Sequence, residues 1–111
     1  MARNIYIELP VEATAPARAF YEAAFDWSFT DFGPTYAATL AGQSDMGLQA
    51  DPAEKTAALL PVVEVDDLEA TLAAVEAAGG TVTQPIFAFP GGRRFHFRDG
   101  DGHELAAMKA D

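Results

Sequence analysis

The stretch LLPVVEVDDLEATLAAVEAAGG, residues 59–80, predicts a buried strand that is followed directly by a helix. Residues 59–65 are the most apolar run of the chain, and a short apolar run bounded by turn residues is typical of a buried strand. Asp66 or Asp67 is expected to cap the helix, because an aspartate side chain accepts hydrogen bonds from the free N–H groups of a first turn. Gly79 predicts the helix end, since the left-handed residue after a helix is usually glycine.

Three further strands are predicted after this helix. They cover residues 81–84, 93–98 and 104–109, and glycine-rich turn sequences separate them. Pro85 is expected to end the first of them, because proline has no N–H to donate to a sheet ladder. The second half of the chain therefore has the order β-α-β-β-β.

The first half repeats this order. Apolar and polar residues alternate over 5–9, which predicts a half-buried strand, and an apolar stripe over 14–25 predicts a helix. Further strands are expected around 27–29, 36–40 and 46–49, and residues 51–58 are interpreted as a linker. Sliding the first half by 54 residues aligns the elements of the two halves, which indicates an internal repeat.

These elements predict an α+β fold in one domain over residues 1–111. Module 1 is expected at about 3–50 and module 2 at about 59–109, each a βαβββ unit. A half alone would expose apolar sheet edges, so we expect the two modules to form a curved eight-stranded cup with the helices on its outer face.

The composition excludes several function classes. The chain has 17 acidic and 7 basic residues, a net charge of −10, which disfavours nucleic-acid partners and anionic membrane surfaces. It has no cysteine, so thiolate nucleophiles, disulfides and zinc–cysteine sites are excluded. We see no signal-peptide pattern and no apolar run of membrane-spanning length, and a cytoplasmic location is therefore expected.

Four segments, in this order and spacing, resemble the vicinal oxygen chelate superfamily of glyoxalases, bleomycin resistance proteins and extradiol dioxygenases. They are AFYEAAFDW (19–27), VEVDDL (63–68), AAGG (77–80) and FRDGDGH (97–103). Two residues depart from the family pattern, because Asp26 replaces the usual glycine and Gly100 the usual proline. The resemblance implies paired βαβββ modules around a cup in which active members bind one divalent metal.

The residues at the family's metal-ligand positions differ from the family pattern. The resemblance places these positions at Tyr6, at Gly47 or Gln49, at Leu60 and at Ala106. Leucine and alanine carry no donor atom, and a neutral tyrosine is a poor ligand for a divalent ion. We therefore expect no metal and no other cofactor, as in the metal-free branch that includes bleomycin-resistance binding proteins.

The resulting hypothesis is metal-independent binding of an amphipathic, partly aromatic and cationic small molecule in the cup, with sequestration similar to bleomycin resistance. Glu8 shares a strand face with Tyr6, and these two side chains would orient the ligand by hydrogen bonds. One alternative is a metal-free lyase or isomerase with Glu8 as base and Tyr6 as acid. Another is a non-catalytic structural member of the superfamily. A homodimer is expected, and pairing within one chain or by a swap between two chains stays open.

The predicted contact residues are those expected to line the cup. They are Tyr6, Glu8, Trp27, Phe29, Gln49, Leu60, Val62, Phe87, Phe89, Arg94, His96, Ala106 and Met108. Arg94 and His96 belong to this set only if Phe95 and Phe97 face the helices, and the strand register that decides this is not fixed by the sequence.

The segment 99–104 looks like half a calcium loop, and a metal site that uses Asp99, Asp101, His103 or Glu104 is one interpretation of it. A hairpin turn is the better interpretation, because aspartate–glycine pairs favour such turns. No metal ligand is therefore assigned.

Overall fold

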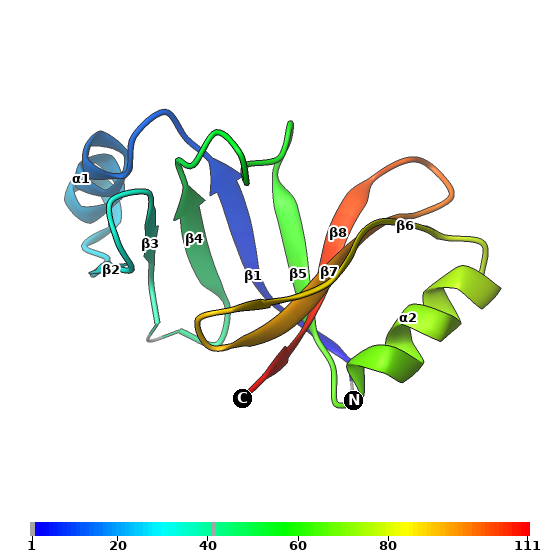
Figure 1. Ribbon diagram of the computed structural model, residues 1–111. Coiled ribbons are helices and arrows are strands. Elements are labelled where there is room, and N and C mark those ends of the chain that lie inside the picture. Colours follow the sequence, from blue (N-terminus) through cyan, green and yellow to red (C-terminus); the bar gives the residue numbers. More distant parts are fainter. Residues whose placement is uncertain (1, 41) are drawn as a thin grey trace. The chain divides into compact units, whose positions relative to one another are not determined.

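The computed structural model describes residues 2–40 and 42–111, which fall into two compact units. The first unit comprises residues 6–60, and the second comprises residues 61–111 with those before position 6. The described residues carry eight strands and two helices, which confirms the α+β class and the β-α-β-β-β order of both halves (Figure 1). The division places the predicted linker 51–58 inside the first unit, while the assignment of one domain stays a prediction.

The first unit is built on a mixed sheet. Its elements are β1 (Arg3–Pro10), of which residues 6–10 belong to this unit, α1 (Thr14–Phe25), β2 (Thr30–Asp31), β3 (Tyr36–Ala38) and β4 (Asp45–Gln49). The strands lie in the order β2-β3-β4-β1. β1 runs parallel to β4, while β3 pairs antiparallel with both β2 and β4.

The core of this unit lies between α1 and one face of the sheet, here called the helix face. Phe29, Ala37 and Leu48 are buried there, and Ala17 and Tyr21 of α1 pack against them. Because side chains alternate along a strand, the neighbours of these core residues lie on the other side, here called the opposite face. Helix and sheet are thus joined by ordinary apolar burial.

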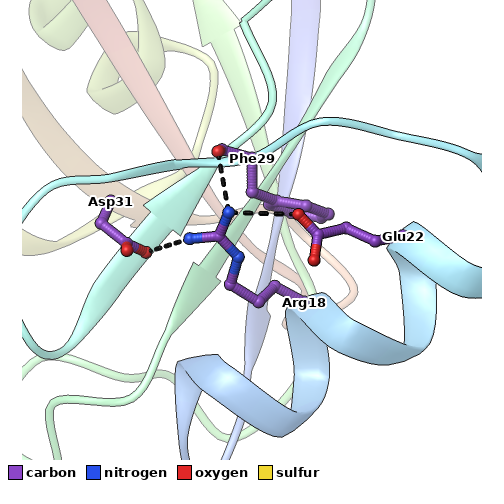
Figure 2. Close-up of polar contacts among 4 residues, drawn as sticks. All are labelled: Arg18, Glu22, Phe29 and Asp31. Atoms are coloured by element: carbon purple, nitrogen blue, oxygen red, sulfur yellow. Dashed lines mark hydrogen bonds and ion pairs between the residues drawn. The ribbon is translucent and has the colours of Figure 1, made fainter.

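Arg18 adds a polar connection between α1 and the loop that leads into β2 (Figure 2). Its Nη2 donates to the Glu22 carboxylate at 3.1 Å and to the Phe29 carbonyl at 3.0 Å. Its Nη1 donates to the Asp31 carboxylate at 2.7 Å. The hydrogen bond to Glu22, followed by the contact with Asp31, raises the pKa of Arg18.

The second unit repeats this plan. Its elements are β5 (Leu60–Glu64), α2 (Leu68–Ala77), β6 (Thr81–Phe89), β7 (Gly92–Arg98) and β8 (Glu104–Ala110). The strands lie in the order β5-β8-β7-β6, with β5 parallel to β8 and the two hairpin pairs antiparallel.

The core of the second unit fixes which side of β7 faces α2. Phe95 is fully buried in a cluster with Val65, Leu68 and Ala107, and Phe97 packs against it. The phenylalanines of β7 therefore lie on the helix face. By alternation, Arg94 and His96 lie on the opposite face, so the first of the two predicted registers is confirmed.

Both helices end where the sequence predicts. α1 covers residues 14–25, as expected, and Asp26 ends it in the left-handed conformation with φ of 58°. In α2 the cap is Asp67, whose side chain accepts a hydrogen bond from the Ala70 N–H. Gly79 has φ of +98° and follows the end of that helix.

Two strands differ from the predictions. The strand expected around 27–29 is the short β2, which starts at Thr30. β6 does not end at Pro85 but continues to Phe89, with two register irregularities against β7. It is the last strand of its sheet, and an edge strand tolerates proline because one row of its N–H groups needs no ladder partner.

Neither helix in the described part of the chain is long and apolar enough to cross a membrane.

Candidate functional site

The opposite face of the second unit carries two buried ionisable side chains. Arg94 is 6% exposed and His96 is 2% exposed. On the neighbouring strand β8, Met108 pairs with Arg94 and Ala106 pairs with His96. Val62 of β5 pairs with Ala106 in turn, so all five residues lie on one face of one sheet.

His96 is oriented by a carboxylate. Its Nδ1 lies 3.0 Å from Oε2 of Glu104, which also accepts a longer bond of 3.4 Å from the Thr83 hydroxyl. With Glu104 ionised, Nδ1 is the donor, which leaves Nε2 as an acceptor in the neutral imidazole. Nε2 is buried and has no hydrogen-bond partner among the described residues. In this form the ring has one acceptor nitrogen that no described residue uses.

Aromatic rings lie beside both groups. The Arg94 guanidinium carbon is 5.4 Å from the Phe87 ring centre and 5.5 Å from that of Phe89, within the range of cation–π contacts. The His96 ring centre is 5.8 Å from that of Phe87. The structure therefore brings Phe87, Phe89, Arg94 and His96 together, and both phenylalanines belong to β6 rather than to a connecting loop.

The opposite face of the first unit has its own buried carboxylate. Glu8 is 2% exposed, and its Oε2 accepts a hydrogen bond of 3.0 Å from the Tyr36 hydroxyl. Gly47 pairs with Glu8 across β1 and β4. A Cβ at Gly47 would collide with the Tyr36 hydroxyl and lie 3.6 Å from the Tyr6 ring, so both tyrosines border this glycine.

Gln49 lies two residues beyond Gly47 on the same side of β4 and is buried. Its side-chain oxygen accepts a hydrogen bond of 3.0 Å from the Asp51 N–H, which fixes the turn after the strand. This oxygen therefore already has a structural partner. Leu60, at the start of β5, is fully buried.

Trp27 and Phe29, which are predicted to line the cup, do not lie with Glu8 on the opposite face. Phe29 is buried in the core on the helix face. Trp27 stacks on Tyr21 of α1, with ring centres 5.8 Å apart. The reason is the left-handed turn at Asp26, after which the chain packs back along α1.

Tyr36 and Glu104 were not among the predicted contact residues. Each is the hydrogen-bond partner of a predicted one, Glu8 and His96 respectively. Tyr36 belongs to β3, and its proximity to Glu8 depends on β4 lying between their strands. Glu104 lies directly across from Arg98 in the β7–β8 hairpin. The signal for its position near His96 is the length of the turn, which sets how the two strands pair.

Arg93 and Asp99 of the hairpin region make local structural contacts. Arg93 pairs with Glu69 of α2 at 2.7 Å and lowers the pKa of that carboxyl. Asp99 accepts hydrogen bonds from the backbone N–H groups of His103 and Asp101, both at 2.9 Å. These bonds, that from His103 first, hold the pKa of Asp99 below its ordinary 3.8. Asp99, Asp101 and His103 are exposed and form the hairpin turn.

The positions that resemble the family's metal ligands do not fit a metal ion. Leu60 and Ala106 have hydrocarbon side chains without a donor atom, and both are fully buried. Gly47 offers no side chain, and the Gln49 oxygen accepts from the backbone. A divalent ion needs several oxygen, nitrogen or sulfur donors, and these side chains do not supply them.

Comparisons with known proteins identify the class. The sequence profile of the Glyoxalase/Bleomycin resistance protein/Dioxygenase superfamily matches residues 5–107, and the chain belongs to this superfamily. No curated protein shows a significant sequence match.

Several solved structures are similar in fold. One is described as an NAD-dependent benzaldehyde dehydrogenase from Legionella pneumophila, with 19% identity, a TM-score of 0.78, and coverage of 96% of this chain and 98% of that one. Another, from Vibrio splendidus 12B01, is a superfamily member with 12% identity, a TM-score of 0.72 and full coverage of both chains. A Mn(II)-bound glyoxalase from Novosphingobium aromaticivorans has 20% identity and a TM-score of 0.67, and the match covers 97% of this chain and 38% of that one. At these identities the likeness shows the fold alone.

Proposed function

We propose that this protein binds an amphipathic, partly aromatic small molecule without a metal ion, as bleomycin-resistance proteins sequester a drug. The binding residues are on the sheet faces opposite the helices. In the second unit they are Phe87, Phe89, Arg94 and His96, and in the first unit they are Tyr6, Glu8 and Tyr36.

The observation that carries this proposal is the buried Nε2 of His96. An imidazole nitrogen that is removed from water without a hydrogen bond costs free energy, on the order of 1–3 kcal/mol. Here Glu104 holds the ring by its other nitrogen, so the ring keeps its orientation. A bound ligand that supplies the missing hydrogen bond would recover that free energy.

The side chains around His96 indicate the chemistry of the ligand. The rings of Phe87 and Phe89 provide flat apolar surface on which an aromatic group can stack. In the first unit, Glu8 with the Tyr36 hydroxyl beside it is suited to a cationic or hydrogen-bond-donating group. We accordingly propose that the face of the second unit takes an aromatic group and a group that pairs with His96, and that the face of the first unit takes a cationic or hydrogen-bond-donating group at Glu8.

Native mass spectrometry of the purified protein tests this binding. The wild-type protein is expected to carry an organic mass. His96→Asn keeps an amide nitrogen near the position of Nδ1 and removes Nε2, so the bound fraction should fall at least fivefold. His103→Asn is the matched control, because His103 is the other histidine of the sequence and lies exposed in the hairpin turn. Equal retention by both variants would refute the role of His96.

A metal-free lyase or isomerase is the second candidate. The sequence predicts Glu8 as base and Tyr6 as acid, and the 3.0 Å hydrogen bond from the Tyr36 hydroxyl to the buried Glu8 carboxylate adds a second candidate acid. Glu8→Gln separates the two functions. The substitution would abolish turnover in an enzyme, whereas in a binding protein it would only weaken a cationic ligand. A non-catalytic structural member would show neither turnover nor a bound molecule.

A further inference from the structure

A cavity of the first unit is lined by none of the proposed contacts Tyr6, Glu8 and Tyr36. Its volume is about 450 Å³. It is lined by the loop after α1, with Asp26, Trp27 and Ser28, and by the turn and strand that include Thr39, Ser44 and Asp45. All of these residues belong to the first unit.

One wall of this cavity is an indole ring held by other aromatic rings. Trp27 stacks on Tyr21 with an interplanar angle of 16°, and its ring centre is 5.1 Å from that of Phe25. These neighbours fix the ring while leaving Trp27 39% exposed. Tryptophan is the best of the aromatic partners for an organic cation, because its ring face carries the most negative potential.

Two carboxylates complete the cavity. Asp26 is held in the left-handed conformation at the end of α1, and its side chain has no hydrogen bond or ion pair among the described residues. Asp45 is fixed by hydrogen bonds to Oδ1 from the Thr39 hydroxyl, at 2.8 Å, and from the Gly42 N–H, at 3.0 Å. The described lining of the cavity includes no lysine or arginine that would neutralise these charges.

The nearby arginine is already paired. Arg18 donates to Glu22, to Asp31 and to the Phe29 carbonyl (Figure 2). It does not line the cavity. The negative potential of Asp26 and Asp45 is therefore not offset from α1, and the net charge of −10 adds to it.

We propose that this cavity binds a small organic cation of the alkylammonium class. The ammonium group would lie on the Trp27 ring face and between the Asp26 and Asp45 carboxylates. Its alkyl groups would contact the ring, and the Ser28 and Ser44 hydroxyls would be within the same lining. The lining of this site shares no residue with the proposed ligand contacts Tyr6, Glu8 and Tyr36, so it does not depend on the proposed function.

Tryptophan fluorescence gives a site-specific test, because Trp27 is the only tryptophan in the sequence. The full chain is titrated with choline chloride at constant ionic strength, and the neutral isostere 3,3-dimethylbutan-1-ol serves as the uncharged control. We expect a saturable change in Trp27 emission with choline and none with the alcohol. A response that rises linearly without saturation, or that is the same for both compounds, would overturn the proposal.

Asp26→Asn tests the carboxylate without changing shape. Asparagine also tolerates the left-handed conformation, so the end of α1 should be preserved. We expect choline binding to weaken at least tenfold. If the asparagine variant does not fold, Asp26→Gly replaces it, because glycine accepts a φ of 58° without strain.

Glu12→Gln is the matched control for net charge. Glu12 is fully exposed, contacts only Lys55 at 3.9 Å among the described residues, and does not line the cavity. It should retain the wild-type affinity for choline. Equal affinities of the Asp26 and Glu12 variants would show that the effect is general charge rather than a site.

Discussion

Gly47 lies where two tyrosine side chains leave no room for a methyl group. A Cβ there would collide with the Tyr36 hydroxyl, which donates to Glu8. Gly47→Ala should therefore displace Tyr36, break its hydrogen bond and lower the free energy of unfolding by about 1–3 kcal/mol, as overpacking does. Urea denaturation followed by circular dichroism measures this change.

Gly100→Ala is the control for that substitution. No atom lies within 4 Å of a Cβ at Gly100, and its φ is not in the left-handed region. Its stability should stay close to the wild-type value. If both alanine variants unfold at the same urea concentration, the contact between Gly47 and Tyr36 does not constrain the fold.

The carboxyl group of Asp99 is expected to make part of the free energy of unfolding depend on pH in the acid range. Hydrogen bonds from the backbone N–H of His103, then of Asp101, lower the pKa of its carboxyl below the ordinary 3.8. A carboxyl with a lowered pKa in the folded state stabilises the fold above pH 3.8, and this contribution is lost as the pH falls through the folded-state value. Asp99→Asn should remove that part of the pH dependence.

Urea midpoints of the wild type and of Asp99→Asn, measured between pH 2.5 and pH 7, check this prediction. The difference between the two proteins should shrink as the pH falls below about 3.8, the ordinary carboxyl value. Asp101→Asn is the control, since Asp101 contributes its backbone N–H rather than its carboxylate to the turn. A difference between wild type and Asp99→Asn that is constant across this range would contradict the assignment.

At the scale of the elements, α2 depends on its cap. Asp67 accepts a hydrogen bond of 3.0 Å from the Ala70 N–H in the first turn. Asp67→Ala removes this acceptor and should cost about 1 kcal/mol of stability, which thermal and urea denaturation both detect. Asp67→Asn keeps an acceptor oxygen and should lose much less. Equal losses in the two variants would mean that the cap bond is not what stabilises the helix start.

Most elements could be predicted from periodicity, and the exceptions have identifiable causes. The alternation over residues 5–9 agrees with the packing of Leu9 against the core of the first unit, and Gly79 follows the end of α2 with a positive φ. The predicted strand ends at Pro85, whereas β6 continues beyond it. The proline is tolerated because β6 is at the edge of the sheet, and the strand order that puts it there cannot be read from periodicity. Trp27 is predicted to be in a strand because aromatic residues are common in strands, whereas in the structure it packs on Tyr21 of the preceding helix.

At the scale of the whole molecule, the sequence predicts one residue of each hydrogen-bonded pair in the candidate site, namely Glu8 and His96. The alternation of side chains along a strand predicts that Glu8 and Tyr6 share a face. For the strand 93–98 it leaves two orientations open, and His96 lies on the face opposite the helix in one of them. Tyr36 and Glu104 complete the pairs, but each lies on another strand, so that finding them requires the inter-strand register. Superfamily membership fixes the fold and leaves the ligand open, because the family's functions differ in the residues of the site.

The homodimer and the cytoplasmic location stay predictions. Light scattering of the purified chain measures the first, since a monomer has a mass of 11.8 kDa and a dimer twice that value. A single species at the monomer mass over the micromolar range would contradict the predicted dimer.

Ligand binding without a metal is the central claim, and native mass spectrometry of the protein before and after EDTA treatment tests it most directly. Because Leu60 and Ala106 offer no donor atoms, the bound organic mass should be retained after EDTA, with no divalent metal in either spectrum. A protein that carries no organic mass, or one that loses it with EDTA and regains it with Mn²⁺, would contradict the account.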